Sequence, residues 1–129
     1  LPQALEELLQ RSLAHGPLRY QFDQLGEQER LPQQVEVGLY RIAQELINNV
    51  IKHAEASELT VQLMQRHGKL SLTVEDDGKG VPPGADAPGM GLANIRTRAQ
   101  AIGATFELEP GDTGGLRALV RWQVDRGSG

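Results

Sequence analysis

One face of a helix expected between about residues 33 and 54 gathers polar side chains. At 100° per residue, this face comprises Glu45, Asn48, Asn49, Lys52 and His53. On a helix taken alone, such a face usually meets only solvent. The two asparagines count against that interpretation, because together they cost about 1 kcal/mol relative to alanine in a helix interior. The face is therefore also a candidate binding surface.

The chemistry of Asn49 suits a magnesium ion that is bound to a nucleotide. Mg²⁺ prefers oxygen ligands and commonly takes only one or two from protein, beside phosphates and water. A neutral amide oxygen supplies one without repelling a triphosphate. Glu45 lies one turn earlier on the same face, so the two side chains can meet at one site. A carboxylate there can orient or deprotonate a nucleophile.

A second candidate, Asp76, ends an expected strand whose apolar residues Leu70, Leu72 and Val74 face the core. Strand side chains alternate, so Asp76 points to that same face. A carboxylate there is costly unless a donor meets it. Two interpretations remain open: a strand-ending Asp-Asp-Gly turn, or a carboxylate whose donor arrives with a ligand. Asp77 has the opposite parity, and we assign it no binding role.

A third candidate is the glycine pair Gly89 and Gly91, which precedes a helix that begins at Leu92. Backbone amides at a helix N-terminus form an anion site when glycine allows close approach. A lone Gly-x-Gly is usually just a turn, and this one is neither a Walker A nor a Rossmann sequence. The preceding residues 81–88 are expected to form a short lid. Arg96 and Arg98 could reach a phosphate, although a surface role is favoured.

The hydrophobic pattern along the chain alternates between helical and strand periods. Helices are expected over residues 2–14 and 33–54 and from Leu92 onward, and strands near 18–22 and 58–66 and around 70–74. Two final strands turn the following residues inward: Ala104, Phe106 and Leu108, then Leu116, Ala118, Val120, Trp122 and Val124. Residues 25–32 and 67–69 are expected turns. This order predicts an α/β two-layer sandwich, with about three helices on one face of a mixed, mostly antiparallel sheet.

Composition limits the possible functions. The 129 residues suffice for one domain, and the net charge of −4 gives no footprint for nucleic acid. No apolar run approaches the roughly 20 residues of a membrane span. The chain has no cysteine, which excludes disulfides, and its three histidines lack metal-ligand spacing, which argues against a zinc site.

Three segments in fixed order resemble the N, G1 and G2 boxes of the Bergerat-type ATPases, which include DNA gyrase, mismatch-repair ATPases, large heat-shock chaperones and sensor histidine kinases. They are QELINNVIKHA at 44–54, EDDGKG at 75–80 and GMGLAN at 89–94. The words YRIAQELINN and GLANIRTRAQAIGA resemble the kinases that pair with NarL-type response regulators. The resemblance covers about residues 31–124 and implies the Bergerat ATP-binding fold.

The resemblance also implies roles for individual residues, with ATP and Mg²⁺ as the cofactors. Glu45 would be the catalytic general base and Asn49 the magnesium ligand, while the adenine amino group would donate to Asp76. The expected nucleotide-binding set is Asn49, Lys52, His53, Asp76, Gly78, Gly80, Gly89, Gly91 and Leu92. Lys52 would contact phosphate, and His53 would flank the nucleotide.

The activity implied is transfer of the γ-phosphoryl group of ATP to a histidine on a separate dimerisation helix, for relay to an aspartate of a response regulator, of NarL type. His15, His53 and His67 do not suit the acceptor role. Residues 1–129 would form one catalytic and ATP-binding domain, with 1–14 the end of a linker and 126–129 a disordered tail. The domain would be monomeric and cytoplasmic, without contact to nucleic acid or membrane, in a bacterial sensor that could itself be membrane-anchored. Two alternatives are a serine kinase of the anti-sigma-factor type and a catalytically silent nucleotide-binding module.

One segment departs from the family pattern. The last box usually reads Gly-Thr, with the threonine near the adenine, whereas this chain has Gly114, Gly115 and Leu116. A hydroxyl that supports Asp76 would then be missing or replaced by water. Weaker nucleotide binding is the expected consequence.

Overall fold

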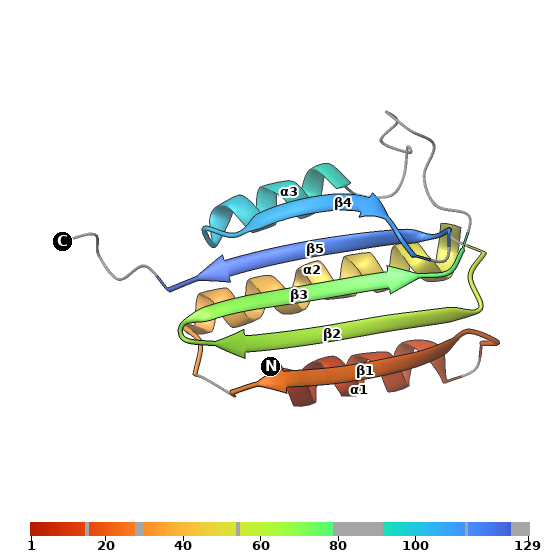
Figure 1. Cartoon of the computed structure of the whole chain (residues 1–129), viewed down its shortest axis with the longest axis horizontal. Helices are drawn as coiled ribbons and strands as arrows, with labels where there is room; N and C mark the ends of the chain where they lie inside the picture. The colour runs from red at the N-terminus through yellow and green to blue at the C-terminus, as the bar shows by residue number, and fades with distance from the viewer. Residues whose placement is uncertain (15, 28–29, 54, 79–91, 113, 125–129) are drawn as a thin grey trace.

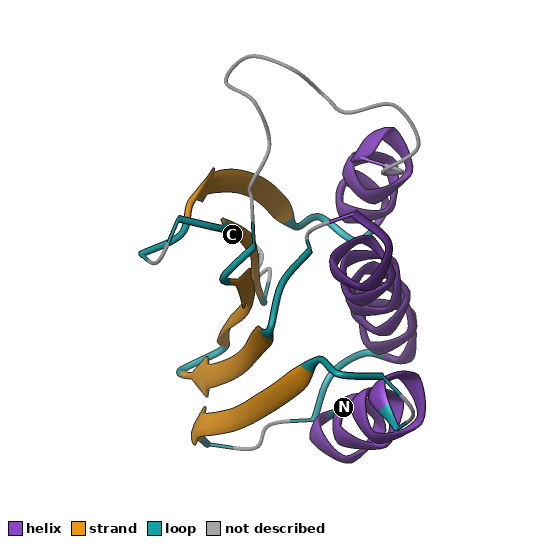
Figure 2. Cartoon of the chain, turned by 90° about the vertical axis from the view of Figure 1, so that its right-hand side faces the viewer, coloured by secondary structure: helices purple, strands orange, loops and turns teal. Residues whose placement is uncertain are grey.

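The protein is described by a computed structural model over residues 1–14, 16–27, 30–53, 55–78, 92–112 and 114–124. Within these ranges, helices cover one face of a five-stranded sheet and leave the other face open (Figures 1 and 2). The elements in chain order are α1 (Pro2–Leu13), β1 (Arg19–Gly26), α2 (Gln33–His53), β2 (Glu58–Arg66), β3 (Lys69–Asp76), α3 (Leu92–Ala101), β4 (Thr105–Pro110) and β5 (Leu116–Gln123). The predicted two-layer α/β sandwich is confirmed.

The sheet has the strand order β1-β2-β3-β5-β4. Strands β1 and β2 are parallel, because the long helix α2 carries the chain back between them, and the other pairs are antiparallel. The β2–β3 hairpin turns at His67 and Gly68, whose φ angles of 53° and 75° suit a tight two-residue turn. The sheet is therefore mixed and mostly antiparallel, as predicted.

The core lies between the two layers. The inward side chains of β2 and β3 alternate as expected, and the burial of Leu59, Val61, Leu63, Leu70, Leu72 and Val74 is nearly complete. Helix α1 adds Leu5 and Leu9, both fully buried, to the same core. This continuous packing fixes how the ends of the helices meet the ends of the strands.

Two expected boundaries were wrong. Strand β1 runs on to Gly26, because Leu25 and Gly26 pair with Met64 and Gln65 in continuous register. Val124 lies beyond β5 and is 37% exposed. The register of β5 on β3 ends with Gln123 opposite Lys69, where the β3 strand begins, so Val124 has no inward place to fill.

Candidate functional site

Segments that carry the expected chemistry gather at one end of the sandwich. Helix α2 and strand β3 both end there, helix α3 begins there, and the turn between β4 and β5 closes the same edge (right-hand side of Figure 1, facing the viewer in Figure 2). Ligands commonly bind at such ends, where backbone groups and polar side chains converge without belonging to the packed core. This end is the candidate site.

Helix α3 packs beside α2 and runs antiparallel to it (Figure 1). Gly38 lies directly against the residue that follows α3: a β-carbon placed there would be 2.7 Å from Cγ2 of Ile102. Helical periodicity puts Glu45, Asn49 and Lys52 on the same stripe of α2, nearer its C-terminal end. Because the helices are antiparallel, this stripe leads toward the N-terminus of α3.

The burial of these side chains differs from the expected solvated face. Asn49 is 9% exposed, Glu45 is half-buried, and Lys52 is exposed. Around the helix axis, the buried arc of α2 begins at Asn49 and ends at Ile47, and the next residue on that side, Ile51, is 45% exposed. Asn49 therefore lies at the border between the buried arc of α2 and the stripe that continues from Gly38.

Asp76 points inward from the last position of β3, as its parity predicted, and is 5% exposed. The Gly78 N–H donates to its Oδ1 at 2.8 Å. Burial raises the pKa of this carboxyl group, against the opposing effect of the Gly78 and Leu116 backbone N–H groups. Each described donor to Asp76 is a backbone N–H group, and a carboxylate has further acceptor positions. It can therefore accept another hydrogen bond from a ligand.

Asp77 points to the opposite face and closes the end of the β2–β3 pair. Its Oδ1 accepts the backbone N–H groups of Ser57 and Glu58 at 2.8 and 2.9 Å, and its Oδ2 accepts the Ser57 hydroxyl at 2.7 Å. Bonds from Glu58 and Ser57 lower the pKa of this carboxyl group. Asp77 is thus a structural clamp, which accords with its lack of an assigned binding role.

The departure at Gly114, Gly115 and Leu116 has a structural counterpart. Leu116 offers Asp76 its backbone N–H rather than a side-chain hydroxyl. A β-carbon on Gly115 would collide with the backbone carbonyl of Asp76, so only glycine permits this approach. The backbone thus supplies a donor where the sequence suggested that one was missing, and weaker nucleotide binding remains a prediction.

Helix α3 begins at Leu92, which is 5% exposed and packs into the core. The Arg96 guanidinium lies over the Phe106 ring, 5.3 Å from its centroid, in the surface role favoured from sequence. Arg98 is exposed. The expected ligands Gly80, Gly89 and Gly91, the expected lid at 81–88 and the side chain of His53 lie outside the described residues.

Comparisons with known proteins identify the family. The sequence pattern of the family described as histidine kinase-, DNA gyrase B-, and HSP90-like ATPase matches residues 34–126. The chain belongs to this family of ATP-binding domains.

Curated relatives are considerably longer than the chain. It is 38% identical over 109 residues to the signal transduction histidine-protein kinase/phosphatase UhpB of Salmonella typhimurium, covering 84% of the chain and 22% of the relative. It is 35% identical over 101 residues to the sensor protein VraS of Staphylococcus saprophyticus, covering 78% and 29%. The chain therefore spans less than a third of these relatives.

Solved structures share the fold. The ATP-binding domain of PrrB from Mycobacterium tuberculosis superposes with a TM-score of 0.74 at 23% identity, over 95% of this chain and 92% of that one. The Acinetobacter baumannii histidine kinase AdeS gives 0.79 at 18% identity, over 96% and 64%. Among the helices described here, none is long and apolar enough to span a membrane.

Proposed function

We propose that this chain is the catalytic and ATP-binding domain of a sensor histidine kinase. In the whole protein it would deliver the γ-phosphoryl group of Mg·ATP to a histidine on a dimerisation helix, for relay to an aspartate of a response regulator of the NarL type. The kinase and sensor names of the relatives support this activity over the serine-kinase alternative. The domain would act in the cytoplasm of a bacterium. Helix α1 would belong to the same domain, since its leucines pack into the core.

The observation that carries the proposal is the setting of Asp76. A buried carboxylate whose described hydrogen bonds come from the backbone is costly in the empty protein. An adenine amino group supplies the donor that would offset this cost, and it distinguishes adenine from guanine, which carries a carbonyl at that position. Asp76 would therefore select the base.

The α2 stripe would hold the phosphate end of the nucleotide. The amide oxygen of Asn49, at the border of the buried arc of α2, has the neutral oxygen chemistry that magnesium accepts. Bound magnesium would neutralise phosphate charge during transfer. Glu45, one turn away and half-buried, would orient the attacking histidine nitrogen or take its proton, while the exposed Lys52 would contact a phosphate.

The remaining expected contacts complete the proposed site. The backbone at Gly78 and Gly80 would approach the base, and Gly89, Gly91 and Leu92 would bring backbone N–H groups to the phosphates. His53 would flank the nucleotide.

Calorimetric titration tests the proposal directly. ATP should bind more tightly with magnesium than with a chelator, and Asn49→Ala should remove most of that difference. Asp76→Asn should weaken ATP binding by about ten-fold or more, because a hydrogen bond to a charged group contributes about 1.5–3 kcal/mol. GTP should bind the parent chain far more weakly than ATP. Equal affinity for ATP and GTP would remove Asp76 from the site.

A further inference from the structure

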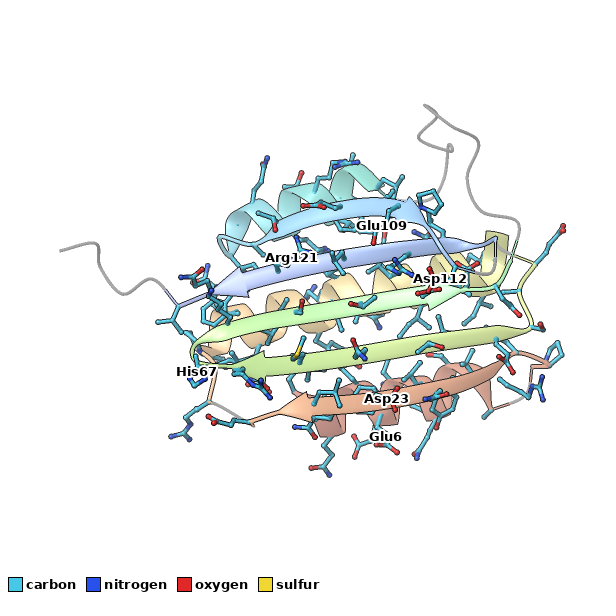
Figure 3. All side chains as sticks on the ribbon, viewed as in Figure 1. Glu6, Asp23, His67, Glu109, Asp112 and Arg121 are labelled. Carbon is cyan, nitrogen blue, oxygen red and sulfur yellow. The ribbon has the colours of Figure 1, made fainter. Side chains whose placement is uncertain are left out.

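Arg117 organises a cluster of carboxylates on the open face of the sheet, opposite the helices. Its guanidinium contacts three of them: Nε meets Glu75 at 2.8 Å, one terminal nitrogen meets Glu109 at 3.0 Å, and the other meets Asp112 at 2.9 Å. These partners come from β3, β4 and the β4–β5 turn. Figure 3 labels Glu109 and Asp112 at the same end of the sheet as that turn. Arg117 thus ties the β4–β5 hairpin to β3.

The strand register places this cluster directly behind Asp76. Arg117 lies opposite Glu75 on β3 and opposite Glu109 on β4, so the three side chains form one row across the sheet. Glu75 precedes Asp76, and alternation sends the two carboxylates to opposite faces of the same strand end. A group that moves the backbone at Glu75 therefore also moves Asp76.

The β4–β5 turn is held in place mainly by contacts on the open face of the sheet. Its glycine-rich sequence gives it little conformational preference of its own, and Gly114 has a φ of 97°. Gly111 N–H donates to the Gly115 carbonyl at 2.8 Å, and Asp112 N–H donates to Oε2 of Glu75 at 3.2 Å. Glu75 therefore pairs with the Arg117 guanidinium and also accepts a hydrogen bond from the turn backbone.

The inner side of the same turn touches Asp76. Gly115 packs against the Asp76 carbonyl so closely that a β-carbon would collide with it. The next residue, Leu116, gives its backbone N–H to the Asp76 carboxylate. The position of the turn therefore determines both the space around this carboxylate and one of its hydrogen-bond donors.

We propose that Arg117, acting through Glu75, is a positioning residue for recognition of the adenine base: it holds the β4–β5 turn so that Gly115 and Leu116 orient Asp76. This inference rests on the proposed function. Without Arg117, three carboxylates would remain close together and repel one another, and the turn would move away from β3. Lysine cannot replace it, because a single ammonium group lacks the planar fork that reaches three partners.

The test compares ATP with ITP, which differs from ATP at the base, where a carbonyl replaces the amino group. Arg117→Ala should weaken ATP binding by about ten-fold, the value of one lost hydrogen bond to a charged group. ITP lacks the exocyclic amino group that would donate to Asp76, so its weaker affinity should change by no more than about two-fold. Arg121→Ala is the matched control, because Arg121 lies on the same face of β5 and makes a looser ion pair to Glu107 at 3.6 Å. It should leave both affinities unchanged.

A double-mutant cycle then tests whether Arg117 acts through Asp76. In an Asp76→Asn background, Arg117→Ala should have almost no further effect on ATP binding. Undiminished loss in that background, equal losses for ATP and ITP, or unchanged ATP affinity in the single variant would each overturn the proposal. If Arg117→Ala does not fold, Glu75→Gln keeps the size of the side chain, and the same outcomes decide. Failure of the proposed function looks different: Asp76→Asn alone would then leave ATP affinity unchanged.

Discussion

Asp76 and Asp77 are adjacent aspartates whose environments shift their pKa values in opposite directions. Asp76 faces the helices, where burial raises its pKa, whereas Asp77 faces the other way and accepts bonds from Ser57 and Glu58 that lower its pKa. The same side chain is therefore a buried acceptor at one position and a stabilising clamp at the next. Strand parity alone separates these roles, which is why the sequence predicted the inward carboxylate.

The first prediction is that Asp76→Asn stabilises the empty protein at neutral pH. A carboxyl group whose pKa is raised on folding contributes its full stability below its ordinary pKa of 3.8 and loses it as the pH rises through the folded pKa. Asparagine cannot ionise, so it avoids this loss. Thermal unfolding followed by circular dichroism should show a higher midpoint for the variant at pH 7, with the advantage shrinking toward pH 4. A lower midpoint at pH 7 would contradict this account of Asp76.

The second prediction is the opposite result for Asp77→Asn. A lowered folded pKa stabilises the fold above the ordinary value of 3.8 and ceases to do so as the pH falls through the folded pKa. The variant keeps the size of the side chain but weakens the bonds from Ser57 and Glu58. Its unfolding midpoint should be lower than that of the parent at pH 7, and the deficit should narrow in acid. ATP affinity should change little, which separates the clamp from the site.

At the scale of the elements, long periodic segments were the most predictable. The bounds expected for α2 and β2 agree with the structure because their apolar residues repeat over many turns or alternations. Edge strand β1 has half-buried and exposed residues, so its hydrophobic alternation did not indicate that the strand continues to Gly26. Long-range pairing across the sheet was not predictable from one sequence. The Arg117 cluster illustrates this, since only the register shows that it lies opposite both Glu75 and Glu109.

The third prediction concerns the β4–β5 turn as a unit. Gly115→Ala places a β-carbon against the Asp76 carbonyl, and because that atom belongs to the backbone, the turn itself must move. Overpacking of this kind costs about 1–3 kcal/mol. We expect a lower thermal midpoint together with weaker ATP binding. Gly16→Ala is the control, because a β-carbon at Gly16 meets nothing within 4 Å and should leave both measurements unchanged. A Gly115→Ala protein that bound ATP normally would show that the turn does not shape the site.

For the whole molecule, the arrangement separates stability from binding. One helix layer and the inner face of the sheet bury the apolar side chains, while one end collects the border residue Asn49, the strand-end carboxylate Asp76 and the start of α3. The site is therefore built on rigid elements but lies at their ends. Residues there can change with limited effect on the core, so variants at the site should retain the fold.

The last prediction is a division of labour between this chain and a separate phosphoacceptor. Incubated alone with γ-labelled Mg·ATP, the chain should acquire no acid-labile phosphate, because His15, His53 and His67 lack the setting expected of an acceptor. Mixed with the dimerisation hairpin of its own parent kinase, it should label that hairpin. Glu45→Gln should slow this transfer by about 100-fold or more, the usual contribution of a general base, while ATP affinity stays within about two-fold. The transfer rate would fall while the ATP affinity stayed nearly constant, because Glu45 would act on the attacking histidine rather than on the nucleotide. Robust acid-labile labelling of the chain alone would place the acceptor within residues 1–129 and refute this division.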